Sequence, residues 1–192
     1  FHANSERLYR LEATSLFNFE EGGKPKKSFF SWLAPKDDGV RNMLTHPYVL
    51  ADDLKDGIPE IEAVVRAQGN NNTVCWYNGQ SYKIEDGTAT FIENNFFSVL
   101  DFPLIEGNRE TVLKGSNSVV IDQSTAKRIF GSQSPMGKII SIPSIENKLF
   151  TVTGVAKDFP VNSSIQYKML FPLEAHPSHQ ENSVDRSNNH FN

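Results

Sequence analysis

The residues with the most obvious chemical potential are histidines in the C-terminal tail. His176 and His179 have the H-x-x-H spacing that can bring two imidazoles to one metal ion, and Asp185 or His190 could complete the site. No second local pair of ligands fixes the geometry, so we interpret the tract as incidental. A hydrolase built on His176, His179 and Asp185 would need a nucleophile, a base and an orienting group that converge, and the pattern does not provide them.

A phosphate-binding loop is a second candidate, because Gly131 and the pair Gly137-Lys138 partly match G-x-x-x-x-G-K-[ST]. Five residues rather than four separate the glycines, and Ile139 stands where a magnesium-binding hydroxyl is required. The segment also follows a predicted helix instead of leading from a strand into one. We therefore expect a structural connector here.

The remaining chemical candidates have structural interpretations. Cys75 is the only cysteine, which excludes an intrachain disulfide, and its apolar neighbours favour a small strand residue over a nucleophile. Asp52, Asp53 and Asp56 lie on a predicted helix, where they are typical of a solvated face. The sequence thus predicts no catalytic residue, no metal site and no cofactor.

The composition is that of an ordinary globular protein. Of the 192 residues 38% are hydrophobic and 22% are charged, and the formal net charge of -4 offers no basic field for nucleic acid. The fourteen Phe residues predict a core built largely on aromatic rings. No apolar run approaches the roughly 20 residues that span a bilayer, and no signal peptide or initiating Met is present. These features together suggest a fragment of a longer chain.

The segment Ser118 to Lys138 reads as a complete strand, helix and turn. Val119 to Ile121 form a β-branched run, and Asp122 is a suitable N-cap for a helix from Gln123 to Phe130. Gly131 is placed to end that helix in a left-handed conformation. After a Pro-Gly turn, Ile139 to Ile142 restart an extended run.

Before that segment, the patterns predict strands and hairpins. Three short strands are expected at Thr73 to Tyr77, Gln80 to Glu85 and Thr88 to Glu93. Asn78-Gly79 and Asp86-Gly87 are strong two-residue hairpin signals, so we expect an antiparallel meander.

Other elements are expected toward the two ends. The N-terminal part predicts a strand from Tyr9 to Phe19 and an aromatic patch at Phe29 to Leu33, for which burial is favoured over a partner-contacting surface. It also predicts a helix capped by Thr45 with Pro47 in its first turn and ended by Gly57, a strand from Ile61 to Val65, and a turn at Gly69 to Asn72. The C-terminal part predicts a helical turn capped by Asn94 or Asn95, strands at Phe150 to Val155 and Tyr167 to Leu173, and a flexible, poorly packed tail from Glu174.

Four stretches together resemble one family. They are Phe1 to Leu11, Ala51 to Arg66, Ala89 to Asn108, and the run of Ser118 to Ile142 with Phe150 to Ile165. Their amino-acid sequences resemble the MacB-like periplasmic core domain of FtsX-like ABC transporter permeases, especially the versions from Bacteroidetes-type bacteria. The match covers most of residues 1 to 173, and Gly131, Pro135, Gly137 and Gly154 fall at its motif positions.

This resemblance implies an α+β fold with two lobes. A discontinuous porter-like β-α-β lobe would comprise residues 1–90 and 155–192, and a sabre-like mixed α/β lobe, residues 91–154, would be inserted in it. The hairpins and the helix from Gln123 to Phe130 would then lie on the membrane-distal side, with both termini in the porter-like lobe.

The resemblance also implies a function. The domain would lie on the periplasmic side of the inner membrane and would be non-catalytic. It would couple movement of transmembrane helices to a substrate or partner outside that membrane. Its implied partners are its own transmembrane helices, a second permease copy, a cytoplasmic ATPase subunit or domain, and a periplasmic substrate or protein. The alternative is a free-standing periplasmic ligand-binding or sensor domain.

Overall fold

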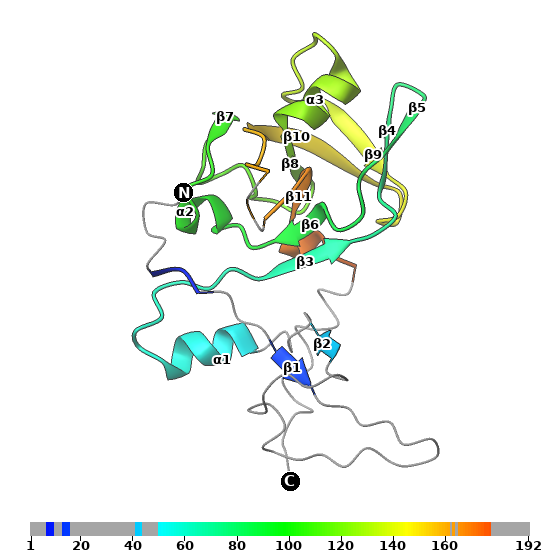
Figure 1. Cartoon of the computed structure of the whole chain (residues 1–192). Helices are drawn as coiled ribbons and strands as arrows, with labels where there is room; N and C mark the ends of the chain where they lie inside the picture. The colour runs from blue at the N-terminus through cyan, green and yellow to red at the C-terminus, as the bar shows by residue number, and fades with distance from the viewer. Residues whose placement is uncertain are drawn as a thin grey trace, which may run out of the picture.

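The protein is built around one mixed β-sheet with two short helices packed on it (Figure 1). The computed structural model describes residues 7–9, 13–15, 41–43, 50–161, 163 and 165–177. Their elements, in chain order, are β1 (Ala13–Ser15), β2 (Arg41–Met43), α1 (Leu50–Gly57), β3 (Ala67–Asn70), β4 (Val74–Tyr77), β5 (Gln80–Lys83), β6 (Ala89–Ile92), α2 (Phe96–Val99), β7 (Leu104–Glu106), β8 (Ser118–Asp122), α3 (Gln123–Phe130), β9 (Ile139–Ile142), β10 (Lys148–Ala156), β11 (Met169–Pro172) and the 3-10 helix η3 (Leu173–Ala175).

The main sheet has the order β3-β6-β11-β8-β10-β9-β4-β5, and β7 pairs with β10. The pairs β10/β8 and β11/β6 are parallel, and the other pairs in this sheet are antiparallel. Mixed sheets of this size commonly bury both faces of their central strands. Every residue of β6, β8 and β11 is indeed buried.

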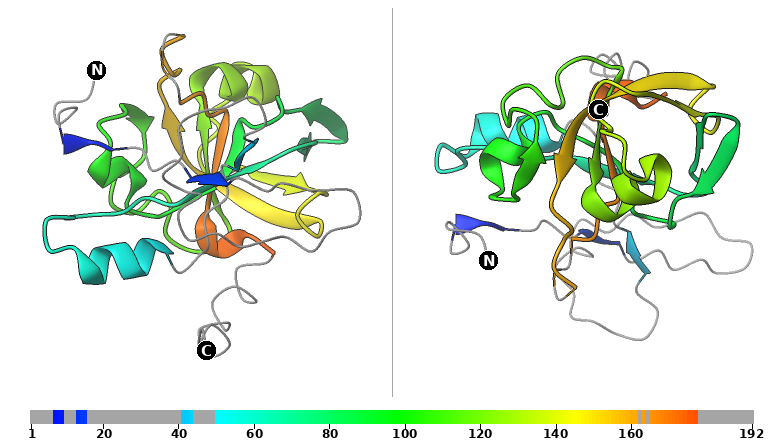
Figure 2. Two further views of the ribbon diagram at one scale, coloured as in Figure 1. Left: turned by 60° about the horizontal axis from the view of Figure 1, so that its bottom comes forward. Right: turned by 90° about the horizontal axis from the view of Figure 1, so that it is seen from above.

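The two faces of the sheet carry separate cores. Val119 and Ile121 of β8 point into a cluster with Ile129 and Phe130 of α3, whereas Val120 between them joins a cluster with Phe96 and Phe97 of α2. The two helices accordingly cover different faces of the sheet (Figure 2). The prediction of an aromatic core is confirmed, since five Phe rings are among the largest fully buried side chains.

The strand, helix and turn unit forms as predicted. The Asp122 carboxylate accepts a hydrogen bond of 2.8 Å from the Thr125 N–H at the start of α3. Gly131 ends the helix at a φ of 62°, which a residue with a Cβ adopts only with strain. The Pro-Gly turn closes through a 3.0 Å bond from Lys138 N to Pro135 O, and β9 then pairs antiparallel with β10.

The first hairpin is confirmed, but the continuous antiparallel meander is wrong at its second turn. β4 and β5 pair across Asn78 and Gly79, which have φ values of 47° and 75°. The pair Asp86-Gly87 also turns the chain, yet only Gly87 has positive φ, and β6 leaves β5 to pair with β3 and β11. A local turn signal cannot specify which strand a following apolar run will pair with, because buried neighbours on both sides decide it.

The strand predicted at Ile61 to Val65 is also wrong. Those residues have no regular structure, and β3 occupies Ala67 to Asn70, including part of the predicted turn. β3 is an edge strand, which pairs with β6 alone among the described strands, and most of its side chains are exposed. Its polar residues therefore give no alternating apolar pattern, and backbone pairing alone defines the strand.

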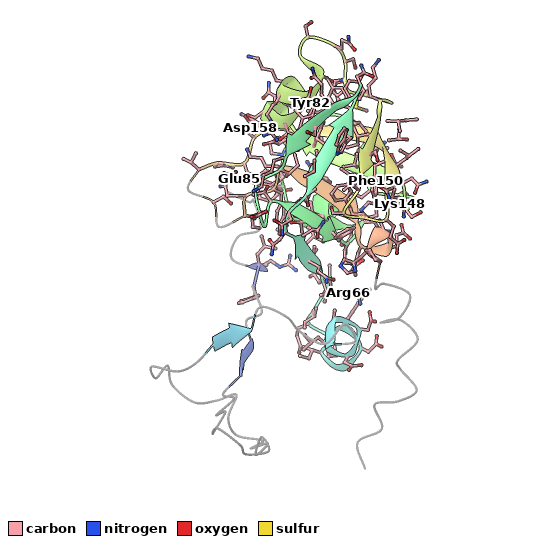
Figure 3. The ribbon with its side chains drawn as sticks, turned by 90° about the vertical axis from the view of Figure 1, so that its right-hand side faces the viewer. Arg66, Tyr82, Glu85, Lys148, Phe150 and Asp158 are labelled. Carbon is pink, nitrogen blue, oxygen red and sulfur yellow. The ribbon has the colours of Figure 1, made fainter. Side chains whose placement is uncertain are left out.

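The helix α1 is linked to the sheet by charged side chains. It ends at Gly57 as predicted, whereas Thr45 and Pro47 lie outside the described residues. Arg66, beside α1 in Figure 3, lies with its Nη1 3.6 Å from Asp52 Oδ2 and donates from Nε to Glu93 Oε1 at 2.5 Å. Asp52 thus has an ion-pair partner, while Asp53 and Asp56 are exposed as expected of a solvated face.

The ends of the chain test the remaining predictions in part. Only Ala13 to Ser15 of the long N-terminal strand is described as strand, and the aromatic patch at Phe29 to Leu33 lies outside the described residues, as do the extreme termini. The prediction of a poorly packed tail from Glu174 is wrong at its beginning, because η3 continues to Ala175, which is buried. Residues 178–192 lie outside the described part.

The helical turn with Phe96 and Phe97 begins after Asn95, as predicted, although the Asn95 side chain does not cap it. Its amide nitrogen donates instead to Val64 O at 3.1 Å. The proposed lobe boundaries stay a prediction. Residue 90 lies within β6 and residue 155 within β10, and strands from both segments join the same sheet.

Close backbone contact at Gly107 generates a stability prediction. Gly107 has a φ of 105°, and a Cβ there would lie 2.6 Å from Val112 Cγ1 and 2.8 Å from Thr153 O. Gly107→Ala should therefore destabilise the fold by about 2 to 4 kcal/mol, through backbone strain plus steric overlap. Gly115 has a φ of 87° but open space around it, so Gly115→Ala should cost about 1 to 2 kcal/mol for strain alone. Urea unfolding of both variants measures the difference, and equal losses would contradict the packing argument.

Candidate functional site

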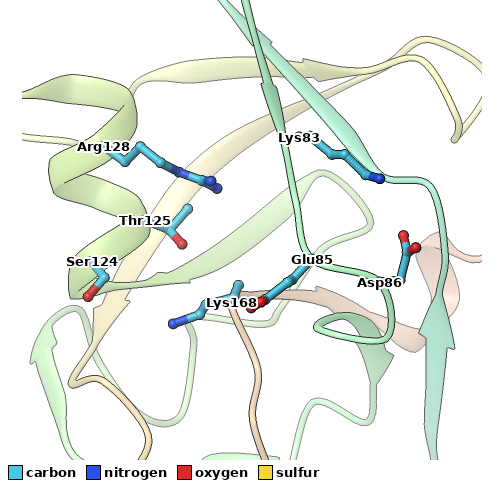
Figure 4. Close-up of a pocket in the computed structure, with 7 residues that line it drawn as sticks. All are labelled: Lys83, Glu85, Asp86, Ser124, Thr125, Arg128 and Lys168. Carbon is cyan, nitrogen blue, oxygen red and sulfur yellow. The ribbon is translucent and has the colours of Figure 1, made fainter.

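A charged cleft lies between α3 and the end of β5 (Figure 4). It has a volume of about 740 Å³. The helix, the β5 end and the residue before β11 contribute its lining, which consists of Lys83, Glu85, Asp86, Ser124, Thr125, Arg128 and Lys168. The cleft is the candidate functional site because it gathers side chains of both charges from three distant parts of the sequence.

One side of the cleft is fixed by a buried ion pair. The Lys168 ammonium lies 2.8 Å from Asp122 Oδ2, and the Asp122 side chain is completely buried. The other oxygen of this carboxylate caps α3. Each carboxylate oxygen therefore has a partner, which offsets the cost of burying the charge.

A second carboxylate, Asp158, binds the first turn of α3. Asp158 Oδ1 accepts from the Ser124 N–H at 2.9 Å, and Oδ2 accepts from the Ser124 hydroxyl at 2.5 Å. Burial raises the pKa of Asp158. The two hydrogen bonds from Ser124 and the charge of Lys168 lower it and together outweigh burial, so the pKa lies below its ordinary value. The protein's own carboxylates thus occupy the positive end of this helix.

Three charged residues of the cleft remain available. Lys83, Glu85 and Arg128 are exposed and form no ion pair with any residue that the structure describes. Figure 4 shows the Arg128 guanidinium extending from α3 across the cleft toward the β5 side. An arginine in this setting is suited to bind a carboxylate or another planar anion with two parallel hydrogen bonds.

Cys75 is confirmed as a small strand residue. It lies in β4 with no exposed surface. Burial raises the pKa of its thiol to about 12, and the charge of Arg128 opposes this rise only in part. At neutral pH the sulfur is therefore protonated and inaccessible, which makes it unsuited to nucleophilic attack.

His176 does not line the cleft. The His176 ring packs edge-to-face on Phe91, with 4.7 Å between the ring centroids. His179, Asp185 and His190 lie outside the described residues. Among the residues that are described, no three His, Cys, Asp or Glu side chains are grouped so that they could hold a metal ion.

The Gly137-Lys138 pair of the phosphate-loop candidate is hydrogen-bonded to the sheet. Gly137 N donates to Val152 O at 2.8 Å, and Val152 N donates to Lys138 O at 2.9 Å. These backbone groups are therefore committed to β10, in agreement with a structural connector.

Sequence reasoning did not find the cleft. Arg128 and Ser124 fall within the helix predicted from Gln123 to Phe130, and Lys83 falls within the strand predicted from Gln80 to Glu85, but the sequence pattern assigns no role to them. The one available signal was the cap at Asp122, which predicts where α3 starts but not what it faces. The partners in the cleft are 34 to 46 residues apart in sequence, so only the tertiary fold brings them together.

A family model for the MacB-like periplasmic core domain matches residues 2–190. The chain belongs to this family. Members are periplasmic domains of ABC transporter permeases, and the resemblance in the sequence is thereby confirmed. Within the part of the chain that the structure describes, no helix combines the length and the apolar character needed to cross a membrane.

The chain is also similar to individual proteins and solved structures. The chain is 28% identical over 120 residues to the Vibrio parahaemolyticus protein called macrolide export ATP-binding/permease protein MacB, of whose length it covers 17%. The crystal structure of a domain of a putative permease from Porphyromonas gingivalis is similar in fold, with a TM-score of 0.65 and 22% identity over 89% of this chain and 64% of that one. The periplasmic region of MacB from Actinobacillus actinomycetemcomitans gives a TM-score of 0.48 with 19% identity, over 66% of this chain and 55% of that one.

The buried carboxylate of Asp122 generates a second stability prediction. Asp122→Ala removes the helix cap and leaves the Lys168 charge without its partner, so it should destabilise the domain by about 3 to 5 kcal/mol. Asp122→Asn keeps an oxygen that can accept from Thr125 N and should lose less. Urea unfolding at neutral pH provides the measurement. Equal losses for the two substitutions would contradict the role given to the cap.

Asp158 generates a prediction about pH. Because its folded-state pKa lies below the unfolded value of about 3.9, the ionised carboxylate stabilises the fold above that pH. This contribution is lost as the pH falls through the folded-state pKa. The wild-type domain should therefore be more stable than Asp158→Asn at pH 7, and the difference should shrink below about pH 4. Unfolding curves of both proteins across this range test the sign, and a difference that grows at low pH would refute it.

Proposed function

We infer that this chain is the extracytoplasmic domain of an ABC transporter permease in the inner membrane, where it faces the periplasm. The observation that carries this proposal is the match of the periplasmic core domain family to residues 2–190. The similar fold of the permease domain from Porphyromonas gingivalis supports it. The curated relative combines ATP-binding and permease parts in one name, and this chain covers 17% of it.

The proposed role is mechanical and non-catalytic. The domain moves with its own transmembrane helices and a second permease copy, and transmits that movement to a substrate or partner protein outside the membrane. A cytoplasmic ATPase subunit or domain supplies the energy. The central strands of the sheet are buried on both faces. This supports such a role, because closely packed strands resist internal deformation and move as one body.

The polar groups of the domain support the absence of chemistry. Asp122, Asp158 and Ser124 are committed to capping α3, and Lys168 is committed to Asp122. Cys75 is buried as a protonated thiol. No side chain in these groups is left in the arrangement of a nucleophile beside an unoccupied base.

The purified 192-residue chain should neither bind nor hydrolyse ATP, because the Gly137-Lys138 part of the phosphate-loop candidate is hydrogen-bonded to β10. Isothermal calorimetry with Mg-ATP should give no saturable heat, and phosphate release should equal that of buffer. The controls are a known ATPase domain and a heat-denatured sample of this chain. Saturable binding would overturn the non-catalytic assignment.

Coupling to a partner can be tested in the intact permease by photo-crosslinking. Ile139 of β9 and Leu149 of β10 are each 57% exposed on neighbouring strands and can carry a photoreactive residue. Crosslinks to one periplasmic species that change between ATP-bound and nucleotide-free membranes would support coupling. Identical crosslinks in both states, from these positions and from the 99% exposed control position Val161, would oppose it.

A further inference from the structure

The strand β5 leaves one side of its backbone unpaired. Ile84 N donates to Thr73 O at 2.8 Å, which makes 73/84 a hydrogen-bonded pair of the β4/β5 ladder. Because such pairs alternate along antiparallel strands, 75/82 and 77/80 are bonded pairs, and Ser81 and Lys83 direct their N–H and C=O groups away from β4. Within the described part of the chain these backbone groups have no hydrogen-bond partner. β5 is also the last strand in the sheet order.

This open edge borders the charged cleft. Lys83 and Glu85 line the cleft from the end of β5, and Arg128 lines it from α3 (Figure 4). A short edge strand that carries a lysine is by itself a common protection against unwanted pairing. The exposed guanidinium of Arg128 across the cleft is not explained by that protection, since it belongs to another element and has no carboxylate partner among the described residues.

The side chains of β5 alternate between the two faces of the sheet. Tyr82 points toward α3, where its hydroxyl lies 3.5 Å from Ile129 O, and Ser81 therefore lies on the opposite face. Lys83, at the end of β5, lines the cleft. A strand added beside β5 would alternate in the same way. One of its side chains would then enter the cleft toward Arg128, and the next would lie on the face of Ser81.

We propose that the open edge of β5 accepts an extended segment of a partner protein as an added strand, with an acidic side chain of that segment bound by Arg128. Backbone hydrogen bonds to Ser81 and Lys83 hold the segment, and the carboxylate selects it. The proposal rests on the proposed function, which requires a partner outside the membrane, and specifies the chemistry of that partner. The net charge of -4 for the whole chain disfavours an anionic membrane surface as the occupant.

The test uses the ¹⁵N-labelled 192-residue chain and a short synthetic peptide of alternating Thr and Val with one central Glu, acetylated and amidated at its ends. Titration followed by NMR should shift the amide signals of Ser81 and Lys83 and reach saturation. A matched peptide with Gln in place of Glu should bind at least about fivefold more weakly, because it lacks the charge-assisted hydrogen bonds.

Two controls separate the charge from the strand pairing. Arg128→Gln should remove the preference for the Glu peptide, while Lys127→Gln, an exposed neighbour that does not line the cleft, should keep it. Peptides N-methylated on one set of alternate residues should lose binding, and those methylated on the other set should keep it, since only one set of N–H groups faces β5. The methylation test leaves the protein unchanged and so does not depend on the folding of a variant.

The outcomes decide the proposal. Equal affinity for the Glu and Gln peptides, or an unchanged preference in Arg128→Gln, overturns the role of Arg128. Equal binding of both methylated sets, or shifts that avoid Ser81 and Lys83, overturns strand addition, as does the absence of saturable binding at millimolar peptide. These results leave the calorimetry with ATP untouched, so failure here is distinguishable from failure of the proposed function.

Discussion

The connection between the end of β8 and the segment before β11 holds the centre of this domain together. Asp122 N donates to Lys168 O at 3.1 Å, while its buried carboxylate binds the Lys168 ammonium and caps α3. Lys168 N in turn donates to Thr88 O at 2.8 Å, next to β6. A single buried carboxylate thus joins the helix to the strands, and its burial is tolerable because both oxygens are hydrogen-bonded.

The rest of the architecture follows from a sheet that is covered on both faces. Alternate residues of β8 pack into two different cores, and its three central positions, Val119 to Ile121, are accordingly all apolar. Close backbone approach fills the remaining space, because Val112 occupies the place where side chains at Gly107 and Gly154 would stand. Arg109 completes this region by donating from Nη2 to Phe97 O at 2.6 Å, at the end of α2.

The charged cleft lies where the buried core ends and polar groups become accessible. Capping and ion pairing neutralise the charges nearest to the core, and those at the rim of the cleft stay in contact with solvent. This change from buried, paired charges to solvent-exposed charges is typical of a surface where a ligand can replace water without disturbing the fold. The proposed recognition site lies beside the edge strand β5.

Local chemistry in the sequence determined the elements with their own start and stop signals. Asp122 and Gly131 bound α3, and Asn78-Gly79 sets the β4/β5 hairpin, because caps and tight turns depend on a few adjacent residues. The family motifs likewise lie within continuous stretches. The tertiary structure alone decided that β6 pairs with β3 and β11, that the polar residues of β3 form an edge strand, and that Arg128 faces β5. Those outcomes depend on contacts between distant segments. Burial and hydrogen bonding across the whole fold decide which segments pair, and no periodic pattern in the sequence indicates the result.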